Sequence, residues 1–165
     1  MTASRETLFQ QIAGELGYSF DGEMKIGGNY APLVRNGKEA YISGQIPRVG
    51  NTVVATGRVG ADIDLDEGQR AAKICAMRAL AILRQSLGGL DQVRRILRIT
   101  VYVQSAPGFT QQSEVADGAS EVLHSVFAAA GGHTRTSVGV YQLPKNAAVE
   151  IDMIVATESE AEPGA

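Results

Sequence analysis

Residues 64–103, DLDEGQRAAKICAMRALAILRQSLGGLDQVRRILRITVYV, contain a strong helix pattern followed directly by a strong strand pattern. Asp64 and Glu67 stand at the spacing of a capping box and Gly88-Gly89 can end a helix, so we expect a helix over 65–87. Its small and apolar residues form one continuous face, which suits close packing on a sheet. These face residues are Ala72, Cys75, Ala76, Ala79, Leu80, Leu83 and Leu87.

A strand is predicted next, over 93–103, because apolar and polar residues alternate there. Arg95 breaks the apolar parity close to the strand start. One face of the strand is therefore expected to lie in the core. That face is predicted to consist of Val93, Leu97, Ile99, Val101 and Val103, and the opposite face of Arg94, Arg98, Thr100 and Gln104.

The flanking segments supply the remaining elements. A helix over 4–17 is predicted from the four-residue spacing of Leu8, Ile12 and Leu16, with Ser4 as the cap and Gly17 as the stop. Turn residues and alternation predict further elements: a hairpin over 31–45 around Asn36-Gly37, a short strand near 52–56, a helix over 111–129, and strands over 135–142 and 149–156. The inner face of the helix over 111–129 is predicted to be Val115, Ala119, Val122, Val126 and Ala129.

This order of elements predicts an α+β fold with a single sheet covered on one face by two long helices. The other face then needs cover, which self-association would provide. Three segments are expected: a helical extension and linker over 1–27, the main domain over 28–156, and a flexible acidic tail over 157–165.

The composition is that of an ordinary globular domain. The 165 residues carry a net charge of −3 and a pI of about 5.4, which argues against nucleic acid as a partner. Cys75 is the single cysteine and lies on an apolar helix face, so we expect it in the core. No metal site or cofactor motif is predicted from only two histidines. With no signal peptide and no apolar run long enough to cross a bilayer, the sequence favours a cytoplasmic protein without membrane contact.

Two charged residues are the main candidates for chemistry. Arg135 follows Gly131-Gly132, where a loop enters a strand, and its planar fork could bind a carboxylate through two bonds. Glu150 has the parity opposite to the apolar residues of its strand, so it projects from the sheet and could activate a water molecule if partly desolvated. A surface arginine at a strand end and a solvated sheet face remain the alternatives.

Three weaker candidates lie near glycine-rich backbone. Tyr30 could line a pocket and present its hydroxyl group, or simply pack. Ser43-Gly44 allows a ligand to approach the backbone N–H of Gly44, but a bulge or strand end fits equally well. His133 could orient a substrate or act as a base, and an ordinary loop residue is the alternative.

Four short segments together resemble the RidA/YjgF family of reactive-intermediate imine deaminases, also called endoribonuclease L-PSP. The segments are Asn29-Tyr30, Ser43-Gly44-Gln45-Ile46-Pro47, Arg135-Thr136-Ser137, and Leu143-Pro144 with Val149-Glu150-Ile151. They occur in the family's order and at close to its spacing, over about 28–156. The resemblance implies a chorismate-mutase-like fold and a homotrimer with ligand clefts between subunits.

The resemblance also implies an activity, the hydrolysis of reactive enamines and imines to 2-keto acids and ammonia. The partner would be a small imine or keto acid bearing a carboxylate. In that scheme Arg135 holds the substrate carboxylate and Glu150 positions the attacking water, while Tyr30 and the Ser43-Gly44 backbone shape the pocket. Ser137 stands where the family often has Cys. Alternatives are a non-catalytic binder of small carboxylates and an endoribonuclease, which the acidic balance argues against.

The chain also departs from the family pattern. His133-Thr134 replaces the usual Pro-Ala, and the N-terminal helix is extra, which resembles a divergent branch. If strands 135–142 and 149–156 paired as a hairpin, Glu150 would lie opposite Tyr141 and roughly 20 Å from Arg135. Under that expectation one small substrate could contact both residues only across a subunit boundary.

Overall fold

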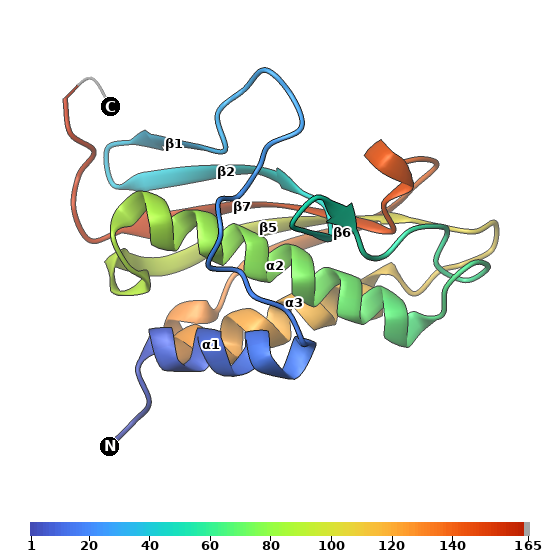
Figure 1. Ribbon diagram of the computed structural model, residues 1–165, viewed down its shortest axis with the longest axis horizontal. Coiled ribbons are helices and arrows are strands. Elements are labelled where there is room, and N and C mark those ends of the chain that lie inside the picture. Colours follow the sequence, from blue (N-terminus) through green and yellow to red (C-terminus); the bar gives the residue numbers. More distant parts are fainter. Residues whose placement is uncertain (164–165) are drawn as a thin grey trace.

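The computed structural model describes residues 1–163 and contains one mixed five-stranded sheet (Figure 1). The strand order is β1-β2-β7-β5-β6. The bounds are β1 Leu33–Asn36, β2 Glu39–Gln45, β5 Val93–Gln104, β6 Thr134–Val140 and β7 Val149–Thr157. Neighbouring strands are antiparallel except for β5 and β6, which are parallel. A separate two-stranded ribbon pairs β3 Arg48–Val49 with β4 Thr52–Val53.

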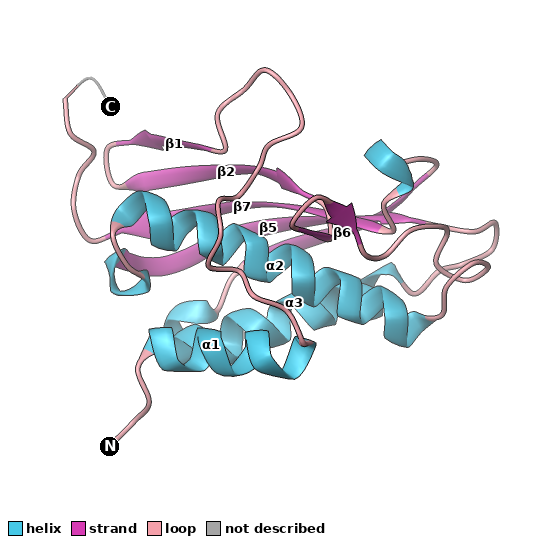
Figure 2. Ribbon diagram, viewed as in Figure 1, coloured by secondary structure: helices cyan, strands magenta, loops and turns pink. Residues whose placement is uncertain are grey.

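Helices cover one face of this sheet, as the sequence predicts (Figure 2). The long helices are α2 Leu65–Leu87 and α3 Gln112–Phe127, and α1 Arg5–Leu16 packs against both. Short 3-10 turns are η1 Leu90–Gln92, η2 Ala128–Gly131 and η3 Pro144–Asn146. The α+β architecture with one helix-covered sheet is confirmed.

The local signals at the ends of α2 are confirmed. The Asp64 side chain accepts a bond from the Glu67 N–H at 2.9 Å, and the Glu67 carboxylate accepts one from the Asp64 N–H at 2.8 Å. Gly88 ends the helix with φ 83°, a left-handed conformation that favours glycine. Cys75 is fully buried among the core residues of α2, as expected.

The helix α1 is capped by Ser4 and ended by Gly17 as predicted, but its buried face is rotated by one residue. Leu16 is buried as predicted, and Phe9 and Ala13 are buried with it, whereas Leu8 and Ile12 are only partly so. Phe9 packs edge-on against Phe20 and belongs to the same hydrophobic core as α2 and α3. The aromatic side chain decides the orientation because it has the larger apolar area to bury.

Two other residues that were predicted to be buried, Leu97 and Ala129, are not. Ile96 is buried in β5 and Leu97 is only partly so, because irregularities between Val93 and Arg95 and between Ile96 and Arg98 shift the strand's parity. Ala129 is exposed because α3 ends at Phe127 and a 3-10 turn follows. The hairpin turn also moves by one residue, since Asn36 pairs with Glu39 and leaves Gly37-Lys38 as the loop.

The expected hairpin between the last two strands is wrong. β5 lies between β6 and β7 and pairs with both of them. Glu150 is therefore opposite Tyr102 rather than Tyr141, and Arg135 is opposite Ile99. The crossover through α3 makes β6 parallel to β5, and strand-to-strand pairing across such a crossover leaves no local signal in the sequence.

The face of the sheet away from the helices carries exposed apolar side chains. Val34 is paired with Tyr41 on that face, and Val138 lies there on the edge strand β6. These three side chains are between 38% and 56% exposed, which is high for large hydrophobic residues. A face of this kind is available for contact with another protein chain.

Residues after β7 continue to bond to the domain. The Glu158 N–H donates to Gln92 O at 2.9 Å and the Ala161 N–H donates to Gly37 O at 2.9 Å. Arg35 also donates to Ser159 O at 2.6 Å. The expected flexible tail over 157–165 is thus anchored as far as Ala161, and its last two residues lie outside the described range. The division at residue 27 remains a prediction.

Candidate functional site

The structure separates the predicted site residues into two groups. Tyr30, Gly44 and Glu150 line one pocket near the irregular end of β2. His133 and Arg135 lie in a shallow groove along α3. The strand register places Arg135 and Glu150 on opposite faces of the sheet, with Cα atoms roughly 14 Å apart from strand rise and spacing. Within one subunit, the two residues cannot contact one small ligand.

The first pocket has a volume of about 200 Å³. Four of its lining side chains are basic and one is acidic. It is bounded by the loop before β1, the end of β2, the middle of α2, and the η3 turn with the start of β7. The lining residues are Lys25, Ile26, Gly27, Tyr30, Gly44, Gln45, Ile46, Arg48, Arg78, Pro144, Lys145 and Glu150.

Glu150 is half-buried and packs directly on the backbone of Gly44. A Cβ atom placed on Gly44 would overlap Glu150 Oε1 and lie 3.0 Å from Cδ, so a larger residue would force the carboxyl group out of this position. Within residues 1–163 the Glu150 side chain has no hydrogen-bond partner. Burial raises its pKa, and the neighbouring Asp152 raises it further. A carboxyl group in this state can exchange a proton with a ligand or a water molecule.

The pocket owes its positive charge to residues that the sequence patterns did not single out. Arg78 lies on the buried side of α2 and is only 4% exposed. It donates to Gln45 Oε1 at 3.2 Å, to Arg48 O at 2.8 Å and to Lys25 O at 3.1 Å. Burial lowers the pKa of Arg78, and the nearby Arg48 lowers it further. A basic residue interrupting the apolar run from Ile74 to Leu83 was the available signal.

Tyr30 lines this pocket, whereas Ser43 lies beside it in β2. Tyr30 is half-exposed and packs beside Gly28, where a side chain larger than glycine would strike its ring. Ser43 donates its hydroxyl to Ala31 O at 2.7 Å, so it fixes the loop before β1 instead of pointing at a ligand. Both assignments as substrate-binding residues remain predictions.

The second group centres on Arg135, whose guanidinium faces α3. One terminal nitrogen donates to Asp117 Oδ1 at 2.8 Å and to Ser120 Oγ at 2.9 Å. The other donates to the carbonyl and the hydroxyl of Ser113 at 3.2 and 2.9 Å. Both terminal nitrogens of the Arg135 guanidinium are therefore already hydrogen-bonded to α3 within the same subunit.

His133 belongs to the same network. Its Nδ1 lies 2.6 Å from Gly131 O and its Nε2 lies 2.9 Å from Ser120 Oγ. Burial lowers its pKa, against the effect of the bond to Gly131, so the neutral ring is favoured. Ser137 is half-buried two residues beyond Arg135 on the same face of β6, without a polar contact in the described part of the chain.

Comparison with known proteins assigns the chain to a family. Residues 16–156 match the family model described as "YjgF/chorismate mutase-like, putative endoribonuclease". The chain belongs to the YjgF (RidA) family. The N-terminal helix α1 lies almost wholly before the matched region, so this YjgF protein carries the predicted extension.

Individual relatives agree with the assignment. Protein TCP17 of Trypanosoma cruzi is 44% identical over 128 residues, 77% of this chain and 80% of that protein. Atu1372 of Agrobacterium tumefaciens, whose function is unknown, is 36% identical with a TM-score of 0.82, over 93% of this chain and 94% of that one. Escherichia coli TdcF, solved with bound serine, has the same fold at 23% identity and a TM-score of 0.58, over 85% of this chain and 96% of that one.

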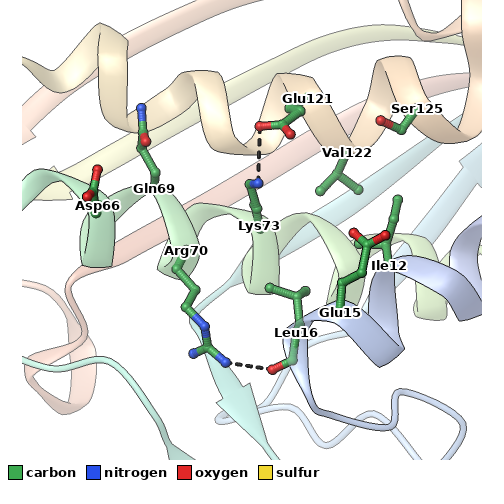
Figure 3. Close-up of a pocket in the computed structure, with 10 residues that line it drawn as sticks. All are labelled: Ile12, Glu15, Leu16, Asp66, Gln69, Arg70, Lys73, Glu121, Val122 and Ser125. Carbon is green, nitrogen blue, oxygen red and sulfur yellow. Dashed lines mark hydrogen bonds and ion pairs between the residues drawn. The ribbon is translucent and has the colours of Figure 1, made fainter.

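A second cavity of this YjgF protein lies on the outer side of the helices (Figure 3). It has a volume of about 360 Å³ between α1, α2 and α3. Its lining contains both signs of charge, with three acidic residues and two basic ones. Lys73 pairs with Glu121 at 3.1 Å, and Arg70 donates to Leu16 O at 2.6 Å while stacking on Tyr18. We assign this groove a packing role.

Metal-binding clusters and membrane-spanning helices were sought in the part of the chain that the structure describes. No group of three or more His, Cys, Asp or Glu side chains there is placed to hold a metal ion. No described helix is both long and apolar enough to cross a membrane.

Proposed function

We propose that this YjgF protein binds a small 2-keto or 2-imino acid beside Glu150 and hydrolyses the imine or enamine form to a 2-keto acid and ammonia. The observation that carries the proposal is the state of Glu150. Its carboxyl group is half-buried, free of hydrogen-bond partners within residues 1–163, and adjacent to basic side chains. Such a group is available to a water molecule and a bound acid at the same time.

The reaction needs a proton acceptor at one step and a donor at the next. An enamine first becomes an imine by gaining a proton at carbon. Water then adds to the C=N carbon, and Glu150 takes a proton from that water as the C–O bond forms. Glu150 returns this proton to the carbinolamine nitrogen and the C–N bond breaks. The hydroxyl group gives its proton back to Glu150 as the C=O bond forms, and ammonia leaves with the 2-keto acid as co-product. A raised pKa suits Glu150 to both directions of proton transfer.

Two further observations support a small acid as the ligand. Four basic side chains line the pocket and favour an anion. The family member TdcF has been solved with serine, a small molecule with a carboxylate. Neither observation distinguishes catalysis from binding alone, so turnover has to be measured.

We propose further that the protein is a homotrimer, with clefts between subunits. The exposed apolar side chains on the uncovered sheet face and the free edge of β6 support self-association. In this arrangement Arg135 of a neighbouring subunit would hold the ligand carboxylate. It would have to exchange its contacts with Asp117 and Ser113 for that ligand.

The decisive experiment couples a threonine dehydratase to this protein and follows 2-ketobutyrate release above the uncatalysed background. Glu150→Gln should lower the acceleration by about a hundred-fold or more, because glutamine keeps the shape but cannot accept a proton. Asp152→Asn is the matched control, since it removes a neighbouring carboxylate from the same face. It should retain most of the activity.

The pH profile adds a second test. Burial and Asp152 both raise the pKa of Glu150, so the ionised base is lost at a higher pH than for an ordinary glutamate. We expect the acidic limb of kcat/KM above the usual glutamate range, and a downward shift of that limb in Asp152→Asn. Wild-type protein that binds keto acids without accelerating any imine would instead be a non-catalytic binder.

A further inference from the structure

The pocket beside Glu150 contains more positive charge than one carboxylate requires. It presents Lys25, Arg48, Arg78 and Lys145 against the single acid Glu150. Within residues 1–163, none of the four basic side chains forms an ion pair. Lys25 and Lys145 are exposed at the rim, whereas Arg48 is partly buried and Arg78 is buried. For these two arginines, positive charge withdrawn from water without a counter-charge is unfavourable, and a bound anion would relieve it.

Arg78 places one charge rigidly at the pocket wall. All three of its acceptors are uncharged, namely one side-chain amide and two backbone carbonyls. These bonds fix the direction of the guanidinium without neutralising it. Because the side chain is almost fully buried, its orientation is set before any ligand arrives.

Arg48 offers a second guanidinium that is not committed. Its side chain makes no hydrogen bond within the described residues, and its Nε is shut off from solvent without a partner. The two terminal nitrogens of Arg48 are not on the buried side of the group, so they are the donors available to a ligand. An arginine fork matches the two oxygens of a carboxylate or a phosphate.

The rim of the pocket includes another basic residue, Lys145, whose backbone conformation is energetically unfavourable. Lys145 has φ 60° and ψ 22°, and Asn146 follows with φ 58°. Two successive non-glycine residues in the left-handed region are unfavourable, and such conformations persist where the surroundings demand them. The turn brings Lys145 to the pocket, next to the start of β7.

We infer that Arg48 and Arg78 form a second anion-binding subsite, and that the preferred ligand is a 2-keto or 2-imino acid with another anionic group, a carboxylate or a phosphate, on its side chain. The inference rests on the proposed function, because the reacting carbon and its own carboxylate would lie beside Glu150. It goes further by naming the class of acid and the residues that select it.

The test compares ligands that differ in one charge. Affinities of wild-type protein for 2-ketoglutarate and for 2-ketopentanoate, which has the same number of carbons and one acid group, are measured by calorimetry. 3-Phosphohydroxypyruvate, a 2-keto acid with a phosphate on its side chain, distinguishes a phosphate from a carboxylate as the second group. Arg48→Met is the main variant, because that side chain has no structural hydrogen bonds. Lys73→Met is its control, since it removes one positive charge from the paired outer groove.

Wild-type protein should prefer 2-ketoglutarate by about ten-fold or more, and Arg48→Met should bring the two affinities within about three-fold by weakening the diacid alone. Lys73→Met should keep the preference. Equal binding of both acids by wild type, an equal loss for both in Arg48→Met, or the same loss of preference in Lys73→Met would each overturn the inference. Selective diacid binding without any imine turnover would refute the deaminase proposal and leave the subsite standing.

Discussion

The outer groove and the pocket beside Glu150 are both lined by basic side chains, but their charges are arranged in opposite ways. In the groove, Arg70 and Lys73 face three acidic residues, and Lys73 is paired with Glu121. In the pocket, four basic residues face one acid whose pKa is raised. The groove is the larger of the two, so volume does not favour the pocket. Our proposal places the ligand in the pocket because its charge is unbalanced.

The comparison also separates stability from chemistry. The groove sits above core residues of α1, whereas the pocket lies at the rim of the sheet and contains groups that folding alone would not favour. We therefore expect substitutions under the groove to change the free energy of unfolding, and substitutions at the pocket to change turnover. Three substitutions test this division.

The largest effect is expected for Phe9→Ala in α1, the helix that borders the outer groove. Phe9 is fully buried against Phe20, and Arg84 lies over its ring, so truncation should cost about 3–5 kcal/mol in unfolding free energy. Urea denaturation measures the loss, with the partly buried Leu8→Ala as the milder control. Turnover by the folded fraction should be unchanged. A loss below 1 kcal/mol would mean that α1 is a detachable extension, as the boundary at residue 27 predicts.

The next effect is expected for Gly44→Ala at the pocket. The new methyl group would occupy the position of the Glu150 carboxylate and force it away, so turnover should fall by about a hundred-fold. Thermal melting should stay close to wild type, because Gly44 does not have a positive φ. Gly14→Ala in α1 has open space around it and serves as the control. If both variants kept full activity, the position of Glu150 would not matter for the reaction.

The smallest effect is expected for Lys73→Met, which breaks the Lys73–Glu121 pair. Both partners are partly exposed, so the free energy of unfolding should change by less than about 1 kcal/mol. Activity should not change at all. A marked loss of keto-acid affinity in this variant would contradict the packing role of the groove and blur the contrast between the two cavities.

Sequence patterns predicted the features that depend on near neighbours. The capping box at Asp64 and the stop at Gly88 are set by residues within one helical turn, and both were correct. The position of β6 was missed because it depends on a pairing with β5 across a whole helix. Ile96 was missed for a smaller reason, since one irregularity in a strand exchanges its two faces.

For the candidate site, the sequence pointed to some of the residues that line the pocket and missed others. Tyr30, Gly44 and Glu150 do lie together, although nothing in their spacing placed Arg48 and Arg78 beside them. Arg78 looked like an interruption of an apolar helix face. Only the fold shows that this interruption points to the end of β2, where the carbonyls that hold it converge.

The central place of β7 has a consequence for how the molecule assembles during synthesis. β1 and β2 form one local hairpin, and β5, α3 and β6 form one local crossover unit. Among the described strands β7 comes last in sequence, yet it lies between these two units, pairing Val155 with Ala40 on one side and with Ile96 on the other. Long-range pairings of this kind form slowly, and a nascent chain is synthesised from its N-terminus onward. The two halves of the sheet therefore stay unjoined until β7 has been synthesised, and a chain truncated before residue 149 would have neither a continuous sheet nor Glu150 to place against Gly44.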